Sequence, residues 1–497
     1  MRMRSLRRQA HLPFLVTALA TGATRAQCSN PWLAIPGANN TVEATATWDP
    51  DGSGPLPPHL VIGGAFTAVG GVAAAHVAAW NPTTGTWSPF GSGTDGTVAD
   101  LFVGANGDLL AVGTFMSAGG TPCNGIARWH AGAWQPVGAG VGGVPRRVVE
   151  TDQGEVVVTG LFTGASAVQN VASFTNGAWQ YTSTDVNPGA PALTKLADGR
   201  VILSGNAGLW QWSPSGLQSH APLSAPTSAL CALRDGGLVA AGQWFQAGAA
   251  TGHIARWDGA TWQPLVNGID LTFVGGINTI VELPDGDLVV GGLFASASGV
   301  PCANLARWDG VAWTPFGAGT DAIVNDAAFL PQGLLAVGGF FATAGGAAAS
   351  RLALLGTTCS GTAAAAGAGC ASSGGSNLLT AVGVPWLGGP FTTEGNGLPP
   401  TSLALVVHGL QALTPGLPLA QALPPSPAGC DLHVLPALVD VALPANGLAR
   451  ATLQIPDAPT ALGLTLFQQW IPLEFDAGGQ LLATTATNAL QLTVGSF

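Results

Sequence analysis

An internal repeat constrains the fold of this chain more than any other feature of its sequence. A Gly-x-Phe element, degenerate in two copies, recurs at seven positions: Gly64, Gly113, Gly160, Gly205, Gly242, Gly292 and Gly339. The steps between them are 49, 47, 45, 37, 50 and 47 residues. A second mark keeps the same period: Trp80, Trp129, Phe174, Trp212, Trp257, Trp308 and Leu354. Because the Gly-x-Phe element and the mostly aromatic position recur with the same period, the chain contains seven copies of one repeat unit.

Each unit contains four short runs that are typical of β-strands. In the sixth unit these runs are Ile277–Leu283, Asp287–Leu293, Leu305–Trp308 and Ala312–Phe316. An Asp-Gly turn joins the first two runs, as expected for a hairpin. Four antiparallel strands in a period near 46 residues are typical of a propeller blade. The sequence therefore predicts an all-β fold with a seven-bladed β-propeller over residues 27–359.

The ends of the repeat array predict how the ring closes. The seventh unit ends at Ser350–Leu355 and lacks a fourth strand with its tryptophan. Near the N-terminus, Pro31–Gly37 parallels the fourth-strand segment Ala312–Gly317 of the sixth unit. We therefore expect the N-terminal strand to complete the last blade, which removes the exposed edges of an open array.

Four of the seven cysteines are predicted to form two disulfides. Cys28 and Cys359 flank the junction where the ring closes, so we expect them to be bonded to each other. Cys370 and Cys430, which lie beyond the repeats, form the second expected pair. The remaining three are predicted to be buried apolar side chains or free thiols: Cys123, Cys231 and Cys302.

The N-terminal residues 1–26 have the pattern of a signal peptide. A basic start is followed by the apolar stretch Leu12–Gly22 and by small residues before Gln27. The apolar stretch is too short to span a bilayer as a helix, although a membrane anchor is the alternative reading. These features predict a secreted protein, extracellular or at the cell surface, with no transmembrane segment after leader removal.

Two further segments follow the repeats. Residues 360–376 are rich in Gly, Ala and Ser, which is typical of a flexible linker. Residues 377–497 contain alternating or apolar runs separated by turns rich in Gly, Pro and Asn. Six to eight strands in about 120 residues predict a small β-sandwich module.

The charge of the chain excludes one class of partner. Its formal net charge is −11, and removal of the five leader arginines moves this to −16 (−11 − 5). Lys195 is the only lysine in the sequence. A surface this poor in cations repels phosphate backbones, so we expect no nucleic-acid binding.

The repeat motifs resemble those of known propellers. The motifs are Gly-Gly-x-Phe, Ala-Arg-Trp-Asp-Gly, Trp-x-Pro-Phe-Gly and Leu-Pro-Asp-Gly-Asp-Leu. They resemble secreted bacterial propeller repeats that are related in style to kelch-like repeats and to fungal cortical polarity-marker propellers. The tail, with Pro385–Gly388 and Asn488–Gly495, resembles a short C-terminal module of secreted bacterial proteins. The resemblance implies an architecture but no function, because propellers host enzymes and binding proteins alike.

Tryptophans fall into two groups in this sequence. Those in repeat register, such as Trp129, Trp257 and Trp308, are expected to pack between neighbouring blades. Trp210 and Trp244 lie in the irregular fourth and fifth units, so they are the candidates for stacking on a sugar. Units three to five, about Val144–Gly268, are accordingly where we expect a ligand site.

Arginines recur in the third strand at Arg128, Arg256 and Arg307. An unpaired buried arginine is costly, so each is expected to have an acidic partner. First-strand acids that share one repeat position, such as Asp100 and Asp326, are the predicted partners. The alternative is a ring of arginines that lines the central channel.

One segment has the beginning of a calcium loop. Asp49, Asp51 and Ser53 supply closely spaced oxygen atoms, but Leu60 stands where the loop would need an acid. A calcium site and a plain hairpin turn are both open readings. No other cofactor is expected.

Catalytic motifs are weak or absent. Asp258–Trp262 approaches the Asp-box of sialidase-like propellers but is one residue short, and Tyr181 is the only tyrosine. The sequence contains neither a Gly-x-Ser-x-Gly nor a His-Glu-x-x-His motif. We therefore predict a non-catalytic protein that binds a glycan or an envelope protein through its propeller. The alternatives are a carbohydrate-active enzyme with two acids in a cleft and a purely structural envelope component.

The Cys28–Cys359 bond yields a direct test. Because it closes a loop of more than three hundred residues, Cys28→Ser is expected to lower the free energy of unfolding by on the order of 5 kcal/mol. Denaturant unfolding without reductant measures this loss, and Cys123→Ser serves as the control. A peptide map of the native protein without a Cys28–Cys359 cross-link would contradict the prediction.

Overall fold

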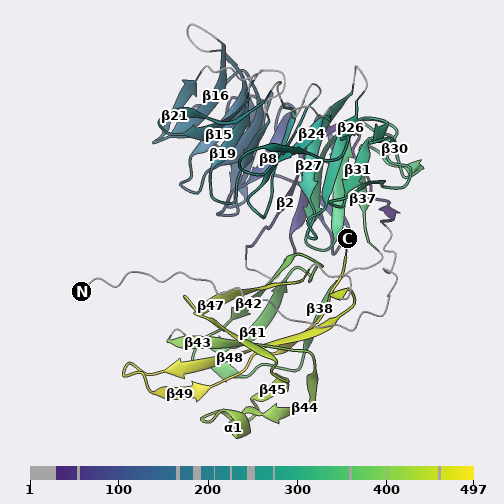
Figure 1. The fold of residues 1–497 in the computed structure, drawn as a ribbon. Coiled ribbons are helices and arrows are strands. Elements are labelled where there is room, and N and C mark those ends of the chain that lie inside the picture. Colours follow the sequence, from purple (N-terminus) through teal and green to yellow (C-terminus); the bar gives the residue numbers. More distant parts are fainter. Residues whose placement is uncertain are drawn as a thin grey trace.

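The structure, a computed structural model, shows an all-β chain (Figure 1). It describes residues 30–496 apart from ten gaps: 53–55, 164–167, 183–191, 206–207, 224–226, 243–251, 272–274, 358–360, 400 and 457–460. Within these ranges the one helix is α1 (Leu419–Ala422). No helix in the described part of the chain is long and apolar enough to cross a membrane.

Seven sheets of the described residues contain four antiparallel strands each. Their first strands are β2 (Val42–Trp48), β8 (Val98–Val103), β14 (Val144–Glu150), β18 (Leu193–Lys195), β22 (Ala229–Ala232), β27 (Gly276–Glu282) and β33 (Val324–Leu330). The second strands are β3 (His59–Gly64), β9 (Leu109–Gly113), β15 (Val156–Thr163), β19 (Val201–Ser204), β23 (Leu238–Ala241), β28 (Leu288–Leu293) and β34 (Leu334–Gly339). The third strands are β6 (Val77–Asn81), β12 (Ile126–His130), β16 (Val168–Thr175), β20 (Gly208–Ser213), β24 (Ile254–Trp257), β31 (Leu305–Trp308) and β37 (Leu352–Leu355). The fourth strands are β7 (Thr86–Pro89), β13 (Ala133–Pro136), β17 (Ala178–Thr182), β21 (Gly216–Pro222), β25 (Trp262–Pro264), β32 (Trp313–Pro315) and β1 (Trp32–Leu33).

Short strand pairs decorate these sheets. They are β4 (Ala68–Val69) with β5 (Val72–Ala73), β10 (Ser117–Ala118) with β11 (Thr121–Pro122), β29 (Ser296–Ala297) with β30 (Val300–Pro301) and β26 (Ile269–Asp270), and β35 (Thr343–Ala344) with β36 (Ala347–Ala348). Most of them connect a second strand to a third strand.

The sheets pack face to face in chain order, which is the arrangement of a β-propeller. Each second strand is an almost continuous apolar run, because both of its faces are covered by neighbouring sheets. Hydrophobic clusters lie between successive sheets. One of them joins Leu60 and Ile62 of β3 to Ala336 of β34 and Leu352 of β37, so the seventh sheet also packs against the first.

Tryptophan side chains in the fourth strands connect successive sheets. Each donates a hydrogen bond from Nε1 to a backbone carbonyl at the end of, or just after, the fourth strand of the preceding sheet. The pairs, at 2.9–3.2 Å, are Trp87 with Pro36, Trp134 with Phe90, Trp179 with Val137, Trp262 with Pro222, Trp313 with Leu265 and Trp32 with Phe316. Trp129 and Trp134 also pack edge to face on Phe90 or on each other. In-register tryptophans thus pack between neighbouring sheets.

The N-terminal strand β1 lies in the seventh sheet. Trp32 is paired with Leu355 and Leu33 with Leu354, both on β37. Next to this pairing, Asn30 Nδ2 donates a hydrogen bond of 3.1 Å to the carbonyl of Gly356. Cys28 and Cys359, predicted to be bonded beside this junction, both lie outside the described residues.

The segment 360–376 is not the linker that its composition predicts. Thr362–Ala366 forms β38, which pairs along its whole length with β50 (Ala489–Thr493). Short strands β39 (Ala371–Ser372) and β40 (Gly375–Ser376) follow. A composition rich in small residues does not prevent a strand here, because the hydrogen bonds between paired strands involve only backbone groups. The alanine methyl groups of this strand pack against the core of the C-terminal sheets.

Two sheets face each other across one core in the C-terminal part of the chain (Figure 1). The larger contains β38, β50, β48 (Thr465–Phe475), β43 (Ser402–Gly409), β46 (Leu438–Ala442) and β49 (Leu481–Thr484). The smaller contains β41 (Leu378–Val382), β42 (Pro390–Asn396) and β47 (Leu448–Gln454), and β44 (Ala412–Pro418) pairs separately with β45 (Asp431–Val434). Trp470, which is fully buried, lies in the shared core.

The cysteines of the described residues follow the predicted pattern. A disulfide joins Cys370 to Cys430, with a Cα–Cα distance of 5.3 Å. Cys123 and Cys302 are buried free thiols, and Cys231 is a partly buried one. Burial raises the pKa of Cys123 to about 11 and that of Cys231 to about 12, so these thiols stay protonated near neutral pH.

One tryptophan of the C-terminal part packs on the propeller. Trp386 is 4 % exposed and belongs to a core cluster of the sixth and seventh sheets. Its ring lies edge to face with Phe329 of β33, and a Cβ atom added at Gly333 would come within 2.5 Å of it. The two parts of the chain therefore share one packed contact.

The packing of Trp32 on the β35–β36 turn can be tested with two adjacent glycines. Both have positive φ, but a Cβ at Gly345 would lie 2.1 Å from Trp32 Cδ1, whereas one at Gly346 would meet nothing within 4 Å. We expect Gly345→Ala to cost about 1–3 kcal/mol more unfolding free energy than Gly346→Ala. Guanidinium unfolding of both variants measures the difference. Equal losses would show that Trp32 does not occupy this place.

Candidate functional site

Two adjoining cavities lie along the first strands of the seven sheets. The channel cavity, of about 340 Å³, is lined by residues of all seven first strands. The mouth cavity, of about 460 Å³, lies at the beginning of several of these strands. Arg147, Ser228 and Asn278 line both cavities, so the two are continuous along the centre of the propeller.

A β-bulge interrupts five of the first strands at one repeat position. Each bulge adds one residue between two partners of the second strand: Glu43 in β2, Ala99 in β8, Arg146 in β14, Asn278 in β27 and Asn325 in β33. All five residues line the mouth cavity. Bulges commonly re-aim a side chain next to a binding site. We name these five residues the bulge ring.

The two asparagines of the bulge ring donate hydrogen bonds to neighbouring first strands, and their side-chain oxygens remain available as acceptors. Asn278 Nδ2 donates to the Val324 carbonyl at 2.9 Å. Asn325 Nδ2 donates to the Val42 carbonyl at 3.1 Å and to Glu43 Oε2 at 3.0 Å. Neither Oδ1 atom accepts a hydrogen bond from any described residue. The ring thus offers amide oxygens to a hydroxyl-bearing ligand.

Glu43, the acid of the bulge ring, is partly buried. Burial raises the pKa of the Glu43 carboxyl above its ordinary value, and the positive charges of Arg147 and Arg146 oppose this rise. The mouth cavity therefore combines one acid, two guanidinium groups and two amides in a small volume.

Asp326 fastens three sheets in the channel cavity. Its Oδ2 accepts hydrogen bonds from the backbone N of Thr45 at 2.7 Å and from Thr45 Oγ1 at 3.0 Å. Its Oδ1 accepts one from Thr279 Oγ1 at 2.9 Å. Both oxygens are thus engaged by the first and sixth sheets, which gives this acid a structural role.

Asp100 has the same role between the second and third sheets. Its Oδ2 accepts a hydrogen bond of 2.8 Å from the backbone N of Val148, and its Oδ1 lies 4.0 Å from Arg147 Nη1. Burial raises the pKa of Asp100 to about 6, although the charge of Arg147 and the Val148 hydrogen bond lower it. One oxygen of Asp100 is thus bonded to the third sheet, while the residue lines the channel cavity.

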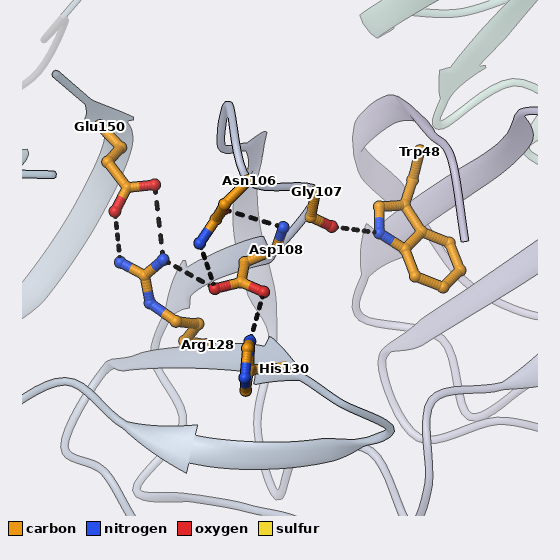
Figure 2. Close-up of polar contacts among 7 residues, drawn as sticks. All are labelled: Trp48, Asn106, Gly107, Asp108, Arg128, His130 and Glu150. Carbon is orange, nitrogen blue, oxygen red and sulfur yellow. Dashed lines mark hydrogen bonds and ion pairs between the residues drawn. The ribbon is translucent and has the colours of Figure 1, made fainter. Parts of the chain in front are cut away.

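The recurring third-strand arginines have acidic partners, but not the predicted ones. Arg128 Nη1 lies 3.1 Å from Asp108, and its Nη2 lies 2.5 Å from Glu150 (Figure 2). Asp108 also accepts from His130 Nδ1 at 2.7 Å and from Asn106 Nδ2 at 2.8 Å. The network lies at the turn between the first and second strands, away from the channel.

The other two arginines confirm this correction. Arg307 pairs with Asp285 at 2.9 Å and with Asp287 at 2.6 Å, and Arg256 pairs with Asp235. Asp100 and Asp326 are therefore not their partners, because third-strand arginines at this position lie next to the turn between the first and second strands. Arg128 also reaches Glu150, which ends the first strand of the following sheet. None of the three arginines lines either central cavity, so the predicted alternative of an arginine ring in the channel is also wrong.

The other predicted site residues lie outside the bulge ring. Trp210 packs against the cluster between the third and fourth sheets, with a buried Nε1, and lines neither central cavity. Asp49 Oδ1 accepts from the backbone N of Asp51 at 3.3 Å and of Gly52 at 3.0 Å. Trp244 and Ser53 fall outside the described residues. Among the residues that are described, no group of three His, Cys, Asp or Glu side chains could hold a metal ion.

The bulge ring was missed because a bulge is a feature of strand pairing. Its residues are chemically diverse, so a search for repeated motifs passes over them. The sequence offers one sign, which is a position that varies from unit to unit next to a recurring valine, as in Val42-Glu43 and Val324-Asn325. When one position varies within an otherwise regular repeat, the fold does not require a particular residue type at that position.

One comparison with known proteins bears on the fold. A family model described as a domain of unknown function (DUF5122) beta-propeller matches residues 283–308, and a search of curated proteins gave no match. The chain is thus a β-propeller protein over its repeat region.

Solved structures that are similar have low sequence identity. A putative gluconolactonase is 12 % identical, with 67 % of this chain and 93 % of that one covered and a TM-score of 0.35. A gluconolactonase from Xanthomonas campestris is 15 % identical over 66 % and 90 %, with a TM-score of 0.36. YCF48 bound to a D1 peptide is 15 % identical over 66 % and 96 %, with a TM-score of 0.40. At these scores, the activities and ligands named for those proteins do not extend to this chain.

Asp100 makes the stability of the protein depend on pH. Its native pKa of about 6 lies above the ordinary aspartate value of 3.8, so the folded state holds this proton more tightly than the unfolded state. Native stability is therefore lost as pH rises from about 4 to 6, and Asp100→Asn removes this loss. The stability of the variant relative to the native protein should increase over that range by on the order of 3 kcal/mol.

Denaturant unfolding at pH 4, 5, 6 and 7 measures this change. Asp198→Asn is the matched control, because hydrogen bonds with Arg200 lower the pKa of that exposed carboxyl. Its relative stability should not change between pH 5 and 7. A flat profile for Asp100→Asn would contradict the burial of the Asp100 carboxyl.

Proposed function

We propose that this chain is an exported recognition protein that binds a glycan at the mouth cavity of its propeller and does not transform it. The observation that carries the proposal is the bulge ring. Five sheets each direct one side chain into the same cavity, and those side chains differ although the surrounding repeat is regular. A position that the fold leaves variable and aims at a cavity is suited to ligand recognition.

A closed ring of seven blades would give this cavity its walls. The pairing of β1 with β37 supports closure by the N-terminal strand. The hydrophobic cluster and the Thr45–Asp326 hydrogen bonds between the first and seventh sheets support it as well. In a closed ring the first strands surround one axis, so side chains from non-adjacent sheets can contact one ligand at the same time.

The size and polarity of the mouth cavity favour a saccharide. A cavity of about 460 Å³ lies in the range that proteins use for small ligands. The acceptors at Glu43, Asn278 and Asn325 suit the hydroxyl groups of a sugar, each of which donates one hydrogen bond. No aromatic side chain is among the described residues that line this cavity, so recognition would rest on hydrogen bonds more than on stacking.

The hydrogen bonds of the channel acids support a proposal of binding without catalysis. An enzyme acting on glycosidic bonds would need two carboxyl groups that face the substrate. Asp100 and Asp326 instead accept hydrogen bonds from neighbouring sheets. Export and display would place such a binding propeller outside the cell, with the C-terminal sheets attached to it through Trp386.

Filling the mouth cavity tests the proposal. Ala99 contributes the smallest side chain of the bulge ring, and Ala99→Phe adds bulk there without removing a side-chain hydrogen bond. On a glycan array probed with residues 27–497, we expect the native protein to bind a defined set of glycans and Ala99→Phe to lose at least tenfold in affinity for them. The exposed Ala133 of β13 lies in the same sheet, so Ala133→Phe is the matched control and should bind normally.

Each other outcome has a clear meaning. Equal binding by Ala99→Phe and Ala133→Phe would place the site elsewhere on the molecule. Products released from a bound glycan over several hours would establish a carbohydrate-active enzyme. If the native protein bound none of the glycans on the array, the glycan proposal would be overturned.

A further inference from the structure

Cationic side chains beyond residue 29 are few, and nearly all have a partner. Nine of the ten have a described ion pair, hydrogen bond or ring contact: Arg128, Arg147, Lys195, Arg200, Arg234, Arg256, Arg307, Arg351 and Arg450. Arg146 is the tenth. Within the described residues its guanidinium group has neither an ion pair nor a hydrogen bond.

Arg146 is solvent-exposed, but it differs from an ordinary surface arginine in its place at the mouth cavity. It is the bulge residue of β14, where the bulge aims it into the mouth cavity. The next residue, Arg147, is held by Asp100 in the channel cavity. The one acid in the bulge ring, Glu43, accepts a hydrogen bond from Asn325 and makes no ion pair with Arg146, although the positive charge of Arg146 lowers the pKa of its carboxyl. A complete set of guanidinium donors is therefore presented to the cavity.

An unpaired arginine in such a place indicates an anionic ligand. The planar guanidinium group binds a carboxylate through two parallel hydrogen bonds, which gives both affinity and orientation. The chain carries a net charge of −11, so its overall field disfavours anions, and binding would depend on the guanidinium groups of the mouth cavity, of which Arg147 also faces Asp100.

We propose that Arg146 binds the carboxylate of an acidic sugar, while Asn278, Asn325 and Glu43 accept hydrogen bonds from its hydroxyl groups. This inference rests on the proposed function and specifies the class of glycan. The mouth cavity then recognises a uronic acid residue, with Arg146 fixing the carboxylate and the acceptors fixing the orientation of the ring.

The acceptors favour a sugar over the free carboxyl end of a peptide. The Oδ1 atoms of Asn278 and Asn325 and the Glu43 carboxylate need several donors within a small volume, and the adjacent hydroxyl groups of a pyranose supply them. A peptide end offers about one backbone N–H per residue, so it would leave most of these acceptors unpaired.

The test compares an acidic oligosaccharide with its neutral ester. Calorimetry is carried out with trigalacturonate and with its methyl ester, on the native protein, on Arg146→Gln and on Arg200→Gln. Arg200 is the matched control because its removal changes the net charge equally, while it pairs with Asp198 outside the cavity. We expect the native protein and Arg200→Gln to prefer the acid, and Arg146→Gln to bind the acid about tenfold to a hundredfold more weakly.

The outcomes separate this inference from the proposed function. Equal binding of acid and ester, unchanged in Arg146→Gln, would overturn the role of Arg146 but leave glycan binding intact. Binding of neutral array glycans alone would do the same. If neither sugar class binds and a peptide with a free C-terminal carboxylate binds in an Arg146-dependent way, both the acidic sugar and the glycan proposal are overturned. Circular dichroism of Arg146→Gln confirms that any loss of binding is not a loss of fold.

Discussion

Burial of both faces of every propeller sheet is the constraint on which the rest of the structure depends. A four-stranded sheet with two apolar faces is stable only when a neighbour covers each face. Seven such sheets meet this need by stacking in order, and the cluster of Leu60, Ile62, Ala336 and Leu352 covers the faces that would otherwise remain open. The tryptophan hydrogen bonds then fix the spacing between sheets, because each indole reaches a carbonyl of the sheet before it. The central cavities exist because the first strands, held at that spacing, do not fill the axis.

Much of this architecture can be predicted from the sequence, because repeat positions carry repeated chemistry. The in-register tryptophans, the Asp-Gly turns and the Cys370–Cys430 bond follow from residue type and spacing alone. Composition was misleading for Thr362–Ala366, where a run of small residues forms a strand since its partner β50 supplies the ladder. The partners of Arg128 were also misjudged, because the choice between Asp108 and Asp100 depends on how far a side chain reaches across a sheet.

Most residues of the candidate site could not be predicted from the sequence. A search for repeats identifies residues that recur from unit to unit, whereas the bulge ring consists of residues that differ from unit to unit at one position. Glu43 and Arg146 do not resemble each other, and only the pairing of first and second strands shows that both are the extra residue of a bulge. Aromatic residues outside the register, such as Trp210, were the natural candidates, but that side chain fills space between two sheets. The residues that pack between sheets and those proposed to bind a ligand therefore occupy different positions of the same repeat.

The pairing of β1 with β37 also has a kinetic consequence. The hydrogen bond between Asn30 and Gly356 spans 326 residues, so the N-terminal strand must wait until nearly the whole propeller has formed before it finds its place. Contacts this distant in sequence slow folding, since their loop-closure entropy is lost before any bond compensates for it. Until then the sheet that ends in β37 has an unpaired edge, which is a template for aggregation. We therefore expect the edge of β37 to be among the last sheet edges of the propeller to be paired.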